Sequence, residues 1–176
     1  MLRALRPAIL VSLIMLVIVG LAYPLAETGI AQAFFSHQAN GSLMSNGSAL
    51  VGQTWTGPRW FQGRPDADDP MATGGTNLGP RSKVLVQDVR KQIALLRKEG
   101  ITPTSDLVTT SGSGVDPDIS PADAYAQVNA VAKARGLFVA AVRNLVAEHI
   151  QPPQFGFLGS SYIDVLQLNE ALAKMR

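Results

Sequence analysis

The chain opens with an apolar segment that is long enough to cross a membrane. Residues 7–26 are twenty positions without a charged side chain. At ~1.5 Å rise per residue, a helix of this length spans ~30 Å, the thickness of the hydrocarbon core of a bilayer. A helix also satisfies its own backbone hydrogen bonds in lipid. The pattern therefore predicts one transmembrane helix over about residues 7–27, with a kink expected at Pro24.

This segment is predicted to be a retained anchor, with a cleaved signal peptide as the less favoured alternative. The apolar run exceeds the ~7–15 residues of a signal peptide's apolar region, and residues 24–27 make a poor small-residue cleavage site. Arg3 and Arg6 precede the run and Glu27 follows it, so the positive-inside rule places the N-terminus in the cytoplasm. We expect an anchor over residues 1–35, surrounded by lipid of the inner (plasma) membrane, and a periplasmic domain over residues 36–176.

Periodic apolar positions indicate that the domain is rich in helices. Helices are predicted at 83–99, 121–135, 138–149 and 163–175, because their apolar residues recur at three- and four-residue steps. Serine precedes each of the first two, and the second opens with a capping-box pattern. Short strands are predicted at 49–55 and 107–110. The expected fold class is α+β: a single N-terminal transmembrane helix followed by one helix-rich periplasmic domain with a small β-sheet.

Charge and composition mainly exclude classes of function. Without the first 35 residues the chain keeps 13 basic and 12 acidic residues, so the basic excess typical of nucleic-acid-binding proteins is missing. The chain has no cysteine, which excludes disulfides, thiolate metal sites and cysteine nucleophiles. A zinc site built from His37, His149 and carboxylates is disfavoured. No metal and no tightly bound cofactor is therefore predicted.

Two glycine-rich loops are the candidates for a ligand site. Residues 74–79, GGTNLG, precede a helix, where backbone amides can bind phosphate; Gly74, Gly75 and Asn77 are the candidate residues. The Gly-Lys-Ser/Thr ending of a phosphate loop is missing, because proline and arginine follow the last glycine. A tight structural loop is the favoured interpretation, and a ligand-binding module is the alternative.

The second loop, TTSGSG at residues 109–114, holds Ser111 and Ser113. These serines also suggest a membrane-tethered periplasmic serine hydrolase, which requires a base within hydrogen-bond reach of the nucleophile. His149 or Lys83 could act as this base only if the fold brings it near. The chain has no Gly-X-Ser-X-Gly elbow, so no catalytic residue is assigned.

A loop of aromatic and charged residues is the candidate partner-binding surface. It contains Trp60, Phe61, Arg64 and Asp66. Aromatic and arginine side chains are favoured as anchors of protein interfaces. An equally favoured interpretation is that Trp60 or Phe61 belongs to the core.

Several sequence blocks, all in one order, resemble a known family and run from the anchor nearly to the C-terminus. The blocks are ANGSL (39–43), GSALVGQ (47–53), FQGRP (61–65), GGTNLGP (74–80), TTSGSGVDP (109–117), ISP (119–121), VAKARG (131–136), GFLG (156–159) and VLQLN (165–169). In this set the chain resembles the C subunit of the Kdp potassium-transporting ATPase. Asp66 departs from the pattern, since a small hydroxyl residue is expected there, and Arg81 and Lys83 are more basic than expected.

The resemblance implies an accessory subunit of a high-affinity, ATP-driven potassium importer. The implied partners are a potassium-binding, channel-like subunit and a P-type ATPase subunit, which handle potassium and ATP. The family is described as a catalytic chaperone that raises the ATP affinity of the pump subunit. A periplasmic domain would not meet cytoplasmic ATP, so an effect through assembly or through the membrane helix is the expected route. As a further hypothesis, Asp66, Asp68 and Asp69 attract cations toward the pore.

Overall fold

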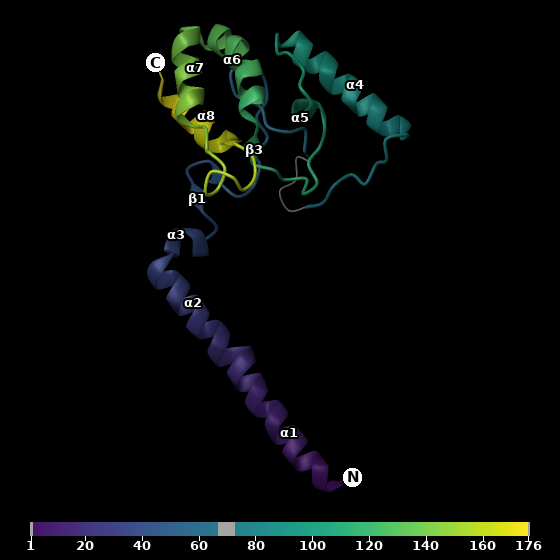
Figure 1. Cartoon of the computed structure of the whole chain (residues 1–176), viewed down its shortest axis with the longest axis vertical. Coiled ribbons are helices and arrows are strands. Elements are labelled where there is room, and N and C mark those ends of the chain that lie inside the picture. Colours follow the sequence, from purple (N-terminus) through teal and green to yellow (C-terminus); the bar gives the residue numbers. More distant parts are fainter. Residues whose placement is uncertain (1, 67–72, 176) are drawn as a thin grey trace. The chain divides into compact units, whose positions relative to one another are not determined.

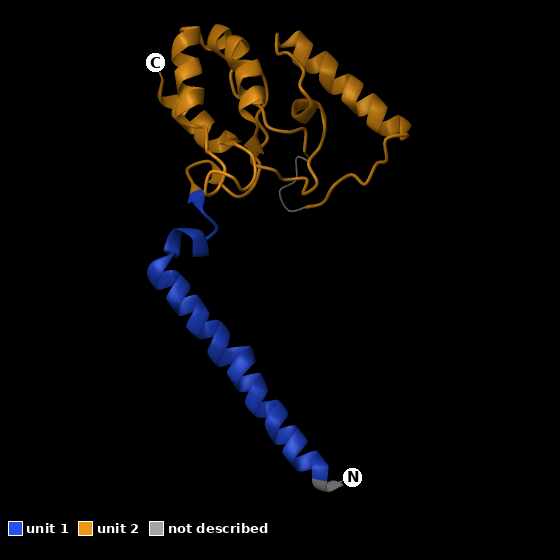
Figure 2. Cartoon of the chain, viewed as in Figure 1, with its two compact units in different colours: residues 1–43 blue, residues 44–176 orange. Residues whose placement is uncertain are grey.

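The computed structural model describes residues 2–66 and 73–175, with side chains from residue 4 onward. Asp68 and Asp69 of the predicted cation-attracting loop lie outside the described residues. The chain separates into two compact units, Met1–Leu43 and Met44–Arg176, whereas the sequence placed the boundary after residue 35 (Figure 2).

Unit 1 consists mainly of one long apolar helix. Its parts are α1 (Leu2–Val17), the π-helical segment η1 (Ile18–Ala22) and α2 (Tyr23–Phe34), and the short helix α3 (Ser36–Ala39) follows. Residues Ala4–Phe34 form a helix long and apolar enough to cross a membrane. The predicted fold class, α+β with a single transmembrane helix, is confirmed.

Pro24 disturbs this helix in a way that the backbone chemistry explains. Proline has no N–H to donate to the carbonyl four residues earlier, and its ring crowds that carbonyl. The helix widens just before it: the Tyr23 N–H donates to the carbonyl of Ile18, five residues back, which is the π-helical spacing. A π-helical turn therefore lies just before the predicted kink site, and Pro24 itself is in the first turn of α2. Thr28 Oγ1 donates to the Pro24 carbonyl over 2.7 Å.

Unit 2 combines helices with two minimal sheets (Figure 1). A hairpin of β1 (Leu43–Met44) and β2 (Gly47–Ser48) lies at its start. The other elements are α4 (Lys83–Lys98), α5 (Ser105–Val108), β3 (Asp118–Ile119), α6 (Pro121–Arg135), α7 (Val139–Glu148), β4 (Ile163–Asp164) and α8 (Val165–Lys174). Strands β3 and β4 are antiparallel, with Asp118 opposite Asp164 and Ile119 opposite Ile163.

The predicted helices are confirmed, and their start signals act as expected. Ser82 Oγ accepts a hydrogen bond from the Leu85 amide at the start of α4. At the start of α6, Ser120 and Asp123 form a reciprocal capping box. The last helix begins two residues later than predicted, because Ile163 pairs in β4 and Asp164 caps α8 by accepting from the Gln167 amide over 2.8 Å.

Both predicted strands are wrong. Residues 49–55 form a turn and then an extended segment outside any sheet, although the Gly52 amide donates to the Val115 carbonyl over 2.8 Å. Residues 105–108 form the single helical turn α5, in which Leu107 is buried and Thr109 Oγ1 caps the end by donating to the Ser105 carbonyl. The first strand was predicted from a segment bounded by glycines and the second from a short run of apolar and β-branched residues; in the second, Leu107 is buried on a helical turn instead.

The core of unit 2 lies between α6, α7 and α8. Its fully buried side chains include Phe61, Val131, Val142, Val146, Leu168 and Leu172. A smaller cluster of Leu96, Ile101, Leu107 and Ala130 attaches the C-terminal end of α4 and α5 to α6. Helix α4 is therefore fixed mainly at one end, since Leu96 is its one fully buried residue among those described.

The segment Phe61–Gln62 crosses this core without a strand partner. Two buried amide side chains take the place of one. Asn169 of α8 accepts from the Phe61 amide over 2.9 Å and donates to the Phe61 carbonyl over 2.8 Å. Gln127 of α6 does the same for Gln62, at 2.7 and 3.0 Å. Buried backbone groups require partners, so these two amides make the burial of the segment possible.

Replacing Asn169 with leucine is expected to destabilise unit 2 strongly. Leucine has the same number of side-chain heavy atoms, but the Phe61 N–H and carbonyl both lose their partners in the core, which costs about 2–4 kcal/mol of unfolding free energy. Chemical denaturation of the full chain in detergent, followed by tryptophan fluorescence, measures the change. Asn129→Leu on the exposed side of α6 is the control and is expected to change stability by less than about 0.5 kcal/mol. Equal stability of the two variants would contradict the assigned role.

Candidate functional site

Arg64 lies at the centre of a polar network that joins three loops. Its Nη1 atom is 3.8 Å from Asp106 Oδ1 and 4.0 Å from Asp116 Oδ2. Its Nη2 atom donates to Thr109 Oγ1 over 3.3 Å and to the Thr110 carbonyl over 3.2 Å. The buried segment Phe61–Gln62 ends two residues before Arg64 and fixes the backbone position of this arginine. The guanidinium therefore joins the 105–110 and 116 regions to the core.

Asp66 holds the serine-glycine loop from the same side. Its Oδ1 accepts from the Ser111 amide over 2.6 Å, and its Oδ2 accepts from the Ser111 hydroxyl over 2.6 Å and from the Asp116 amide over 2.9 Å. A carboxylate that receives several backbone and hydroxyl donors is a strong, charge-assisted contact. The amide and hydroxyl of Ser111 and the amide of Asp116 are thus occupied by the chain's own carboxylate. In this network we include Arg64, Asp66, Asp106, Thr109, Thr110, Ser111 and Asp116, and call it the Arg64–Asp66 network.

The two glycine-rich loops contact each other directly. The Gly74 amide donates to the Ser113 carbonyl over 2.6 Å. Gly114 has a φ of 74°, and a Cβ atom there would lie 2.5 Å from the Gly74 carbonyl oxygen. Only glycine fits both the backbone conformation and this approach. The two backbones therefore pack against each other at this point and leave no room for a ligand between Gly74 and Gly114.

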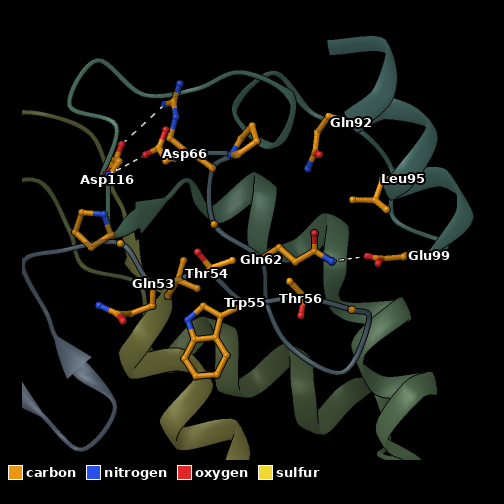
Figure 3. Close-up of a pocket in the computed structure, with 17 residues that line it drawn as sticks. Gln53, Thr54, Trp55, Thr56, Gln62, Asp66, Gln92, Leu95, Glu99 and Asp116 are labelled. Atoms are coloured by element: carbon orange, nitrogen blue, oxygen red, sulfur yellow. Dashed lines mark hydrogen bonds and ion pairs between the residues drawn. The ribbon is translucent and has the colours of Figure 1, made fainter. Parts of the chain in front are cut away.

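Two cavities border the network. One of about 360 Å³ lies between the 52–57 segment, the Arg64–Asp66 network and α4. In Figure 3, Gln92 and Leu95 of α4 and Glu99, which follows α4, lie on one side of it, and Gln53, Thr54 and Trp55 lie on the other. The Gln62 side chain donates to Glu99 across it. The other cavity, of about 300 Å³, lies between α4 and the two glycine-rich loops, and its lining includes Leu78, Leu85, Val89 and Val108.

The carboxylates on the two paired strands repel one another. Asp118 lies opposite Asp164 in the sheet, and its amide donates to Asp116 Oδ1 over 3.1 Å. Burial, followed by the charges of Asp116 and Asp164, raises the pKa of Asp118 to about 6. Burial also raises the pKa of Asp164, although hydrogen bonds from Gln167 act in the opposite direction.

A second acidic pair lies beside Arg64. Burial raises the pKa of Asp106, and the hydrogen bond with Asp123 and its charge add to this effect. Arg64 lowers the same pKa, but less. Among the described residues, no group of three or more histidine, aspartate or glutamate side chains could hold a metal ion. The network is therefore a set of hydrogen bonds and weak ion pairs that orders loops.

Comparison with known proteins bears on this arrangement. A family model described as "K+-transporting ATPase, c chain" matches residues 5–174. The chain belongs to this family. It is 47% identical to a potassium-transporting ATPase KdpC subunit of Sorangium cellulosum, over 98% of each chain. A KdpC subunit of Caulobacter vibrioides is 46% identical, over 98% of this chain and 93% of that one. One of Acidobacterium capsulatum is 45% identical, over 97% and 98%.

The predicted partner-binding residues of this c chain take different positions. Phe61 is fully buried in the core, so it offers no surface to a partner. Trp60 is half-buried: its ring centroid lies 5.0 Å from that of Trp55, and the Arg135 guanidinium lies over it at 5.0 Å. Arg64 and Asp66 belong to the internal network described above. A partner role for Trp60, Arg64 and Asp66 stays a prediction.

The predicted ligand and serine residues are brought together, but not as a catalytic site. Ser111 is buried, and its Oγ atom contacts Asp66, Ser113 Oγ and the Gly114 amide. The bases considered from sequence are not among these contacts: His149 Nδ1 lies 2.8 Å from the Leu145 carbonyl oxygen of its own helix. Asn77 has a φ of 54°, as expected in a tight loop. In this c chain the tight-loop interpretation of residues 74–79 therefore fits the geometry.

Some residues that hold the Arg64–Asp66 network in place lie outside it and were not predicted from the sequence. Gln127 of α6 and Asn169 of α8 are fully buried polar residues, and Glu99 is the residue that caps the end of α4. The available signal was a polar residue at a buried position of the helical period, in AYAQV (124–128) and LNEAL (168–172). Such a residue can equally lie at the edge of the buried stripe, so the pattern alone does not place it in the core.

Removing the Asp66 carboxylate is expected to loosen the 109–116 loop. In Asp66→Ala the Ser111 and Asp116 amides lose their acceptor, which lowers the unfolding free energy by about 1–3 kcal/mol. Asp66→Ser keeps one acceptor, so an intermediate loss is expected. Amide hydrogen exchange of residues 109–116 in the full chain measures the local effect. The matched control is Asp88→Ala, whose carboxylate makes an exposed pair with Lys91. Unchanged exchange in Asp66→Ala would contradict the assignment.

The raised pKa of Asp118 predicts a pH-dependent stability. Its folded pKa of about 6 exceeds the ordinary value of 3.8, so the folded state binds more protons between these values. Asp118 therefore destabilises the fold as pH rises from 4 through 6. At pH 7.5, Asp118→Asn is expected to be more stable than the unmodified chain by about 1 kcal/mol, allowing for solvent screening. Denaturation at several pH values tests this, and a difference that does not shrink toward pH 4 would contradict it.

Proposed function

We propose that this chain is a non-catalytic accessory subunit of a high-affinity, ATP-driven potassium import complex. Membership of the c-chain family supports a place in such a complex, together with a potassium-binding, channel-like subunit and a P-type ATPase subunit. The observation that carries the accessory role is the Arg64–Asp66 network. It uses the amide and hydroxyl of Ser111 and the amide of Asp116 for internal hydrogen bonds, and Ser111, the loop's buried serine, has no base beside it.

The proposed topology places unit 2 in the periplasm. The apolar helix Ala4–Phe34 is long enough to cross the inner membrane. Arg3 and Arg6 come before the apolar run and Glu27 comes after it, which favours a cytoplasmic N-terminus. In this orientation unit 2 and cytoplasmic ATP lie on opposite sides of the membrane.

An effect on the ATP affinity of the pump subunit would then be indirect. A subunit on the outer face changes the affinity of a cytoplasmic site only by preferring one conformation of the complex over another. We propose that the membrane helix and the contacts of unit 2 with the channel-like subunit supply this preference. Both stabilise the assembled complex, while ATP and potassium are bound by the other subunits.

The alternative functions have less support from the site. A serine hydrolase needs a base beside the nucleophile, whereas Ser111 Oγ contacts an aspartate, a serine and an amide. A ligand-binding module needs free donors where the two loops meet, whereas the Gly74 and Gly114 amides already donate to Ser113 and Ser111. The cavity of about 360 Å³ beside α4 is the feature that still fits a small ligand.

Growth under potassium limitation tests the proposal. A strain that lacks this chain is expected to stop growing at low potassium and to recover when the full chain is supplied. Residues 36–176 exported behind a cleavable signal peptide are expected not to restore growth, because the membrane helix takes part in assembly. Purified complex with and without the chain should also differ in the ATP concentration that half-saturates its ATPase activity.

Two outcomes would contradict the proposal. Normal growth of the deletion strain at low potassium would remove the role in potassium import. Full rescue by the exported domain would show that the membrane helix is dispensable, and the effect on the pump would then have to pass through unit 2 alone.

A further inference from the structure

The cavity of about 360 Å³ beside α4 is lined by groups whose hydrogen-bonding capacity the chain itself does not use. The described part of the chain has three buried side-chain nitrogen or oxygen atoms without a hydrogen-bond partner. Two of them, Trp55 Nε1 and Arg64 Nε, belong to residues that line this cavity. Buried donors without an acceptor are rare because they destabilise a fold. Two such donors at one cavity indicate an acceptor that comes from outside the chain.

Further polar groups of the lining are able to bind a ligand. In Figure 3, the Gln92 side chain points from α4 toward the cavity, and it makes no hydrogen bond with another side chain among the described residues. Glu99 accepts from the Gln62 side chain through its Oε2 atom, which leaves its Oε1 atom available. The cavity therefore offers two donors without acceptors, together with an amide and a carboxylate oxygen that can accept.

Apolar surface lies among these polar groups. The indole of Trp55 and the side chains of Pro65, Leu95, Pro117 and Val165 also line the cavity. Sites for small molecules combine apolar walls with a few well-placed polar groups, and they usually measure about 300–1,000 Å³. The cavity has both the composition and the size of such a site.

The charges of the lining disfavour charged ligands. Three carboxylates, Asp66, Glu99 and Asp116, stand against one guanidinium, that of Arg64. Three negative charges against one positive charge repel an anion such as a phosphate ester. A cation has no acceptor to offer to the N–H groups of Trp55 and Arg64, which would then stay unsatisfied. The ligand that fits is therefore neutral and carries oxygen acceptors.

We propose that this cavity binds a small, neutral, polyhydroxylated molecule of the size of a monosaccharide or a cyclitol. A hydroxyl group both donates and accepts, so one ligand can accept from Trp55 Nε1 and Arg64 Nε and donate to the Glu99 carboxylate. The indole face of Trp55 suits the apolar C–H face of a sugar ring. This site is additional to the accessory function proposed above and does not depend on it.

Binding requires a local adjustment of the cavity wall. Trp55 Nε1 and Arg64 Nε are buried, so an oxygen reaches them when neighbouring side chains turn aside. Residues 52–56 belong to no helix or strand, and α4 is fixed mainly at its C-terminal end by Leu96. Both walls can therefore move around a ligand without breaking a helix or a sheet.

The first test uses the two tryptophans of the chain as probes. Trp60→Phe leaves Trp55 as the one tryptophan, and Trp55→Phe leaves Trp60. The full chain is studied in phospholipid nanodiscs, because the sugar headgroups of maltoside detergents would compete for such a site. Titration of Trp60→Phe with D-glucose or with myo-inositol is expected to give a saturable change in tryptophan emission, whereas Trp55→Phe should give none.

Charged analogues test the class of the ligand. D-glucose 6-phosphate, an anion, and D-glucosamine, a cation, are expected to require at least tenfold higher concentrations for half-saturation than the better of the two neutral probes. Ionic strength is held constant throughout, so that screening does not differ between the titrations.

A substitution in the lining assigns the response to this cavity. Gln92→Ala in the Trp60→Phe background removes the free amide and is expected to raise the half-saturating concentration by about tenfold. Gln151→Ala is the matched control, because this exposed glutamine is not part of the lining, and no change is expected. Both variants should keep the unfolding midpoint of their background, since neither side chain is buried.

A second measurement detects the hydrogen bond itself. In Trp60→Phe, the indole N–H proton resonance of Trp55 is expected to move downfield on saturation with the better neutral probe, because the N–H gains an acceptor. Several outcomes would overturn the proposal: no saturable response to either neutral probe, an equal response in Trp55→Phe, tighter binding of a charged analogue, or an unchanged indole resonance at saturation. Binding that Gln92→Ala leaves intact would place the probe outside this cavity and overturn it as well.

Discussion

The fold of unit 2 depends on how one irregular segment is buried. Phe61 lies in the middle of the core, and its backbone passes between α6 and α8 with no strand beside it. The side chains of Gln127 and Asn169 supply four hydrogen bonds to Phe61 and Gln62, in the pattern that a neighbouring strand would supply. Without them the segment could not enter the core, because buried backbone groups need partners. The two amides thereby set the position of every residue that follows, up to Asp66.

The Arg64–Asp66 network is a consequence of that position. Arg64 and Asp66 leave the core on a backbone that is already fixed, so they reach the 105–116 region at small entropic cost. Their contacts are strong where amides meet the Asp66 carboxylate and weak where Arg64 lies 3.8–4.0 Å from carboxylates. Beside the network, burial and then the charges of Asp116 and Asp164 raise the pKa of Asp118.

The sequence predicted the helices well because their signals are local. Apolar residues at helical spacing, a serine before α4 and a capping box before α6 are all visible without tertiary contacts. The strands were mispredicted because β3 and β4 have two residues each and exist only as a pair that is distant in sequence. The candidate site was predicted in part: Arg64, Asp66 and Ser111 were singled out separately, but their mutual contacts depend on where Gln127 and Asn169 hold the chain. Phe61 shows the same limit, since adjacent aromatics suit a core and an interface equally.

Polar groups of the serine-glycine loop make hydrogen bonds within unit 2, whereas some apolar side chains of unit 2 are exposed to solvent. This distribution agrees with the proposal of a subunit that acts by contacting other proteins. An enzyme needs polar groups that are held in place but left free for a substrate, whereas the serine-glycine loop uses its polar groups internally. A subunit that acts by contact instead needs apolar side chains that are held in place but left uncovered. Phe155 and Phe157 have this property, in the segment 151–162, whose two ends pair by backbone hydrogen bonds. The polar groups of this loop therefore order unit 2, while the exposed aromatic rings remain available for contact, an arrangement that agrees with the accessory role proposed above.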